Sequence, residues 1–212
     1  MNRILAGAIL TAALHVASAA WAAEFRWPTA FTDGAVPPID ASLVLGRPDG
    51  RVADFRGGDC AATYRNFTAV EPYDPAALAA ALGVAPDLVV AADFIAFEAW
   101  GVSFELSTWT FSAGGVTHAV EAPGDALAFG TITSATYAAF FGLQAGIDPL
   151  DEWQFALLDT GPVDVLAADF AVEIQRGDGP YGSPDLDAIG AMTGGAVPAA
   201  GATWSGVRAL YR

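Results

Sequence analysis

Apolar and polar residues alternate strictly along several short stretches of the chain. In segment 100–106 every second residue is apolar, beginning with Trp100, and the residues between are glycine, serine and glutamate. This period of two is that of a β-strand with one buried and one solvated face. Trp109 and Phe111 continue the alternation, but at odd-numbered instead of even-numbered positions. We therefore predict a β-bulge near residues 107–108, because one extra residue would return these side chains to the same face.

Further strands are predicted from apolar runs and alternation, with turns rich in glycine, proline and aspartate between them. Residues 112–115 predict a hairpin turn, and 203–211 predict a strand that closes the sheet. Prolines and glycines interrupt the region 24–59, where we predict loop apart from a short strand at 41–46. The other predicted strands cover residues 116–121, 127–132, 153–157, 170–174 and 186–192.

Two segments carry helix signals instead. Asp74 as N-cap, Pro75 in the first turn and Gly83 as the terminator predict a helix over 75–82. A second short helix is predicted over 134–141, with Ser134 as its cap. Short strands with few helices between them are typical of a β-sandwich or jelly roll, whereas a parallel sheet needs a crossover helix after nearly every strand. We expect a mainly β, antiparallel β-sandwich or jelly roll with one or two short helices.

The first 22 residues resemble no part of a folded domain. Arg3 is followed by an apolar run to about Ala20, and Ala20-Trp21-Ala22 has the small-x-small form of a cleavage site. This is the pattern of a secretory signal peptide. We therefore expect an exported, periplasmic or extracellular protein whose mature chain, residues 23–212, forms one β-sandwich domain without a transmembrane segment.

The charge balance restricts the partners of the protein. Nine arginines and no lysine stand against 24 acidic residues, giving a formal net charge of −15 at pH 7. A chain this acidic repels phosphate backbones, so nucleic-acid binding is not expected, and an anionic membrane surface is disfavoured. Cys60 is the only cysteine, which leaves no intramolecular disulfide to stabilise the fold.

No catalytic motif is complete in the sequence. Cys60 and His118 are the only cysteine and histidine of the mature chain, and an unreactive thiol is the favoured interpretation of Cys60. Glycoside hydrolysis needs only two carboxylates, and Glu98, Glu105 and Glu173 are candidates. Each of these glutamates is expected on the solvated face of a strand. An enzyme is therefore the less favoured class.

The stretch GDGPYGSPDLDAIG, residues 177–190, carries the one candidate metal site. Asp178, Asp185 and Asp187 flank a glycine-rich loop whose carbonyls can turn inward, and hard cations such as calcium take oxygen ligands of this kind. The same residue types are ordinary turn formers, so a simple connection between two strands is the alternative.

The segment SPDLDAIG within this stretch resembles the corresponding segment near the last strands of galactose-binding-like jelly-roll modules of secreted bacterial surface proteins. The resemblance implies a β-sandwich whose loops at one end hold calcium or a sugar, and it carries over only Asp185 and Asp187. Tyr181, in the same loop, is a candidate sugar-binding residue. Trp109 is a candidate stacking platform for a sugar if it is exposed, and a core residue otherwise.

These observations favour a non-catalytic binding or structural role, with calcium as a candidate cofactor and a carbohydrate or cell-surface partner. One alternative is a polysaccharide hydrolase that uses carboxylates. Another is a purely structural or adhesive module, which an unpaired edge strand or an exposed apolar patch would favour.

Overall fold

The computed structural model describes residues 23–33, 40–54, 61–99, 107–143, 152–176 and 185–194. Three α-helices and one 3₁₀-helix occur in this part of the chain: α1 (Pro75–Leu82), α2 (Pro86–Ala91), α3 (Ser134–Phe141) and η1 (Ala41–Leu43). The strands are β1 (Ala23–Asp33), β2 (Ala53–Asp54), β3 (Ala61–Tyr73), β4 (Phe94–Ala99), β5 (Ser107–Ala113), β6 (Val116–Ala122), β7 (Ala128–Thr133), β8 (Glu152–Leu158), β9 (Ala171–Arg176) and β10 (Asp185–Thr193).

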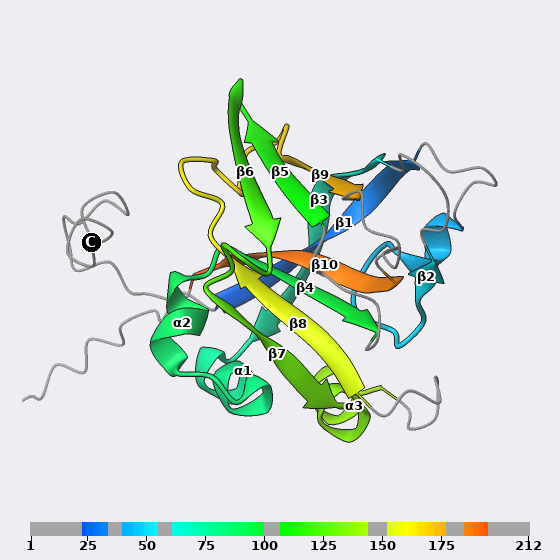
Figure 1. Ribbon diagram of the computed structural model, residues 1–212, viewed down its shortest axis with the longest axis vertical. Helices are drawn as coiled ribbons and strands as arrows, with labels where there is room; N and C mark the ends of the chain where they lie inside the picture. The colour runs from blue at the N-terminus through cyan, green and yellow to red at the C-terminus, as the bar shows by residue number, and fades with distance from the viewer. Residues whose placement is uncertain are drawn as a thin grey trace, which may run out of the picture.

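All ten described strands belong to one sheet (Figure 1). Their order is β6-β5-β9-β3-β1-β10-β4-β8-β7, and β2 pairs with the beginning of β10. Every strand pair is antiparallel. The predicted mainly β, sandwich-like fold is therefore confirmed, with three short α-helices instead of one or two.

The sheet curls, so that its two halves pack against each other. Phe94 in β4 contacts Trp109 and Phe111 in β5 with ring centroids 6.1 and 5.0 Å apart, although four strands separate β4 from β5 in the sheet order. We call the apolar cluster between the two halves the sheet–sheet core. Its fully buried members include Tyr64, Phe94, Trp109, Phe111, Ala156, Leu158, Val172 and Ile189.

The helices cover the opposite face of the central strands, as Figure 1 shows for α1 and α3. Ile95 and Phe97 point to this side, while Phe94 and Ala96 point into the sheet–sheet core, so both faces of β4 are buried. We call the second cluster the sheet–helix core. Its buried members include Phe25, Trp27, Leu78, Leu82, Ile95, Phe97, Tyr137, Phe141, Trp153, Phe155 and Leu157.

Both predicted helices, α1 and α3, are present, and they begin and end near the capping residues in the sequence. In α1 the Asp74 carboxylate accepts the amide N–H of Ala76 at 2.8 Å, and Gly83 ends the helix in the left-handed conformation at φ 67°. In α3 the N-cap is Thr133, one residue before the predicted Ser134. The short helix α2, which begins at Pro86, was not predicted.

The prediction of loop is wrong for residues 24–33 and 53–54, which form strands, and holds for residues 47–52, which lie outside helices and strands. Residues 23–33 form the long strand β1, which pairs with β3. Pro28 is accommodated because the register between the two strands shifts between Trp27 and Pro28. The predicted strand at 41–46 is replaced by η1, which the Asp40 side chain caps at the Ser42 N–H.

No register shift occurs along β5 from Ser107 on, so the bulge predicted near residues 107–108 does not lie within the described strand, and residues 100–106 before it lie outside the described residues. The predicted strand segments 100–106 and 203–211 and the predicted signal peptide 1–22 lie outside the described residues. None of the described helices has the length and apolar character needed to span a membrane.

Candidate functional site

Asp187 is the best-defined candidate site residue because it is a carboxylate buried inside the fold, with 3% of its surface exposed. The pairing of β10 with β4 passes from Leu186↔Glu98 to Ala188↔Phe97, so Asp187 is the extra residue of a β-bulge. Leu186 lies in the sheet–sheet core and Ala188 in the sheet–helix core. The bulge turns Asp187 to the same side as Ala188, beneath helix α3.

Three donors converge on the Asp187 carboxylate. The backbone N–H of Gly50 donates to Oδ2 at 3.0 Å, and the N–H of Asp49 donates to Oδ1 at 3.3 Å. The hydroxyl of Tyr137, in α3, donates to Oδ2. Each oxygen therefore accepts at least one hydrogen bond, as a buried carboxylate requires.

The surroundings of this group change its protonation. Burial raises the pKa of the Asp187 carboxyl from its ordinary 3.8 to about 7, although the hydrogen bonds from Tyr137, Asp49 and Gly50 favour the ionised form. Burial also raises the pKa of Tyr137 well above its ordinary 10, and the charge of Asp187 acts in the same direction. The Tyr137 ring stacks on Trp153 at 4.5 Å, which fixes the hydroxyl toward β10.

The segment that supplies the two amide donors is held at several points. Gly46 donates its N–H to the carbonyl of Pro28 at 3.0 Å, and Gly50 turns the chain at φ 77°. Arg47 pairs with Glu71 of β3 at 3.3 Å, and its guanidinium also donates to the carbonyl of Phe141 in α3. The segment 46–50 therefore joins β10, β3 and α3 at one end of the sheet.

Glu98 is the second buried carboxylate, and it is fully inaccessible. It follows Phe97, which faces the helices, so by alternation Glu98 faces the sheet–sheet side together with Gln154, its partner on β8. The expectation that Glu98 lies on a solvated face is wrong, because β4 is a central strand with both faces covered. Glu98 and Asp187 consequently lie near the same strand ends but on opposite faces of the sheet.

Of the three predicted calcium ligands, the structure describes the side chain of Asp187 alone. Asp187 is bound by the donors described above, whereas Asp178 and the side chain of Asp185 lie outside the described residues. Within the described part of the chain, no three histidine, cysteine, aspartate or glutamate side chains come close enough to hold a metal ion. The convergence of the three aspartates stays a prediction.

The candidate sugar-binding aromatics are placed as follows. Trp109 is fully buried in the sheet–sheet core, in contact with Phe94, so its ring offers no surface to a sugar. Its burial follows from the curl of the sheet, which brings β4 against β5. Tyr181 and Trp100 lie outside the described residues.

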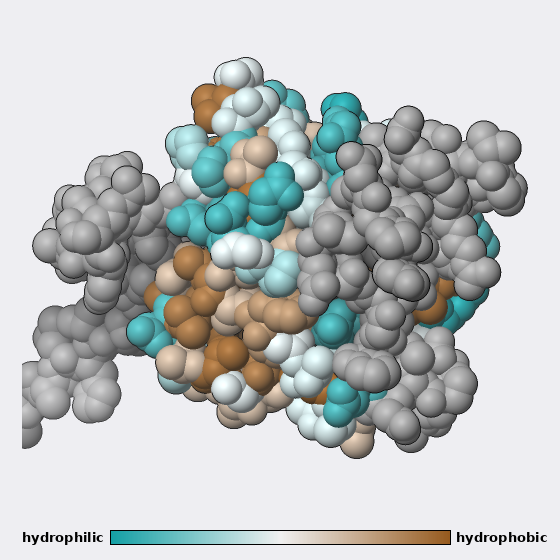
Figure 2. Space-filling view, viewed as in Figure 1, coloured by the Kyte–Doolittle hydropathy of each residue, from teal (hydrophilic) through white to brown (hydrophobic). Residues whose placement is uncertain are grey.

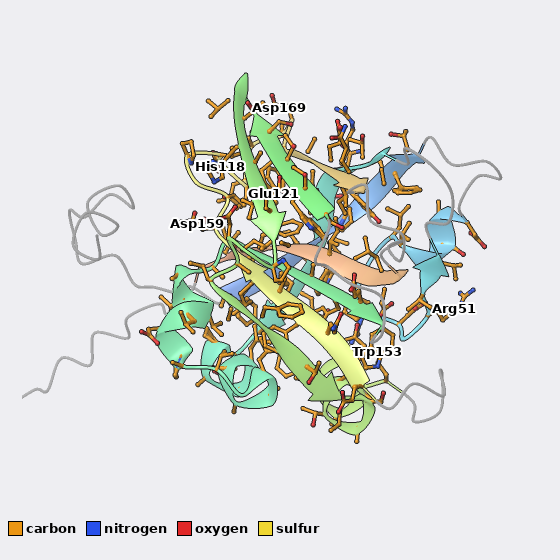
Figure 3. All side chains as sticks on the ribbon, in the orientation of Figure 1. Arg51, His118, Glu121, Trp153, Asp159 and Asp169 are labelled. Atoms are coloured by element: carbon orange, nitrogen blue, oxygen red, sulfur yellow. The ribbon has the colours of Figure 1, made fainter. Side chains whose placement is uncertain are left out.

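The remaining catalytic candidates in the described residues are His118 and Glu173, on β6 and β9. His118 is half-buried on β6, and its ring packs on the backbone of Gly161, where an added Cβ would lie 2.8 Å from the ring. Figure 3 shows His118 and Asp159 far from Arg51 and Trp153, which mark the Asp187 end of the sheet. Glu173 is half-buried on β9, and Cys60 and Glu105 lie outside the described residues.

Sequence reasoning missed Tyr137 and the Asp49-Gly50 amides as partners of Asp187. Tyr137 is 50 positions and Gly50 is 137 positions away in the chain, so no local spacing joins them. One local signal exists, because the apolar residues of 186–191 change parity between Leu186 and Ile189. That change indicates a bulge, and the polar residue at the bulge is Asp187.

Comparisons of the chain with protein-family models, with curated proteins and with solved structures found no match.

Proposed function

We propose that this chain is an exported, non-catalytic protein that acts by binding a cell-surface partner or by forming part of an extracellular structure. The observation that carries the proposal is the pair of edge strands at the two ends of the sheet. β6 and β7 each have only one neighbour in the described sheet, and each presents a large exposed apolar side chain. Val116 on β6 is 42% exposed and Phe129 on β7 is 39% exposed.

Edge strands of this kind favour contact with other molecules. An edge offers backbone N–H and C=O groups to a neighbouring chain, and proteins usually protect it with charged side chains. β7 contains no charged residue. An edge strand without charged residues offers its backbone groups as a template for pairing with another chain.

The alternative of a carboxylate-dependent hydrolase is less well supported. Two catalytic carboxyl groups must flank one glycosidic bond, about 5 to 10 Å apart across a shared cleft. Among the described residues the two buried carboxylates, Glu98 and Asp187, face opposite sides of the sheet. Asp187 in addition holds the segment 46–50 in place, which is a structural task.

A cell-binding assay with matched variants tests the proposal. The labelled mature chain is expected to be retained saturably on cells of its source, and Phe129→Lys is expected to weaken retention about tenfold. Leu166→Lys is the control, because Leu166 is 57% exposed but lies in the connection after β8. Release of new reducing ends from polysaccharides by the wild type, abolished in Glu173→Gln, would overturn the non-catalytic assignment.

Export and calcium have separate tests. The N-terminal sequence of the secreted protein is expected to begin at Ala23. For calcium, a thermal melt with the ion and with chelator is decisive, because a ligand that binds the folded state raises the midpoint. An unchanged midpoint in the wild type would remove Asp178, Asp185 and Asp187 as ligands.

A further inference from the structure

We draw no further inference here: the strongest candidate, the polar row of Thr131, Gln154 and Glu98 that crosses β7, β8 and β4 on the sheet face carrying the exposed Phe129 ring (toward the viewer in Figure 2), carries no proposal because nothing in the part of the chain that the structure describes shows what covers it.

Discussion

The two cores on either side of β4, β8 and β10 are assembled in different ways. The sheet–sheet core joins strands that are far apart in the sheet order, and its described contacts are dominated by apolar rings such as Phe94, Trp109 and Phe111. The sheet–helix core joins strands to short helices and contains the Asp187 carboxylate with its donor Tyr137. Apolar packing maintains the curl of the sheet. The helix layer also depends on the hydrogen bonds of the Asp187 carboxylate, whose protonation depends on pH.

The largest expected effect on stability is that of a substitution in the sheet–sheet core. Phe94 is fully buried and contacts rings from β3 and β5, so Phe94→Ala removes packing that joins the two halves of the sheet. We expect a loss of about 3 to 5 kcal/mol in the free energy of unfolding, measured by urea denaturation. Phe129→Ala, at an exposed ring, is the control and is expected to cost about 1 kcal/mol or less.

The second prediction concerns pH and the sheet–helix core. The pKa of Asp187 is about 7 in the folded protein and 3.8 ordinarily, so the folded state binds this proton more tightly. The contribution of Asp187 to stability is unreduced below pH 3.8, falls as the pH rises from about 4 to 7, and stays reduced above 7. The change is on the order of a few kcal/mol.

This pH effect is measured as a difference, because the other carboxylates also titrate. The free energy of unfolding of the wild type minus that of Asp187→Asn is expected to decrease between about pH 4 and 7. Phe94→Ala should lower stability without changing this slope. A difference that rises over the same range would contradict the assignment.

Tyr137→Phe is expected to lower the free energy of unfolding by a smaller amount than Phe94→Ala. The change removes one of the three donors to Asp187 and keeps the ring that stacks on Trp153. We expect about 1 to 3 kcal/mol of destabilisation above pH 7, where the carboxylate is ionised and needs its donors. Thermal melts at pH 8 compare this variant with Tyr73→Phe, whose ring stacks on Phe25 away from Asp187. Equal losses would show that the Asp187 contact is not the cause.

The smallest expected effect on stability is that of removing the N-cap of α1. Asp74→Ala removes the N-cap of α1 and is expected to cost about 1 kcal/mol. Asp74→Ser, which retains a capping oxygen, should recover most of this loss in the same denaturation experiment. If serine and alanine behave alike, capping is not what Asp74 contributes.

The sequence was informative where the determining residues are neighbours in the chain. α1 was predicted because its cap, its first-turn proline and its terminal glycine all lie within residues 74–83. The β5–β6 hairpin was predicted for the same reason, since Gly114 and Gly115 form its turn. Strand β1 was missed because Pro28 suggests a loop, and only its pairing with β3 shows that a register shift accommodates it.

The candidate site was beyond local reasoning. The turn residues around Asp187 suggested a calcium ligand or a plain connection, and the structure places the carboxylate beneath α3 with amides from residues 49 and 50. Glu98 was expected in solvent because alternation predicts one solvated face. A central strand with both faces covered does not obey that rule, and β4 is such a strand.

The most direct test of the central claim, that Asp187 is a buried structural anchor of the helix layer, is its own titration. Carboxyl ¹³C NMR of the mature chain, with Asp187→Asn used to assign the resonance, follows this group alone. The account predicts a midpoint near 7, raised by burial. A midpoint near the ordinary 3.8 would show a solvated carboxylate and would contradict it.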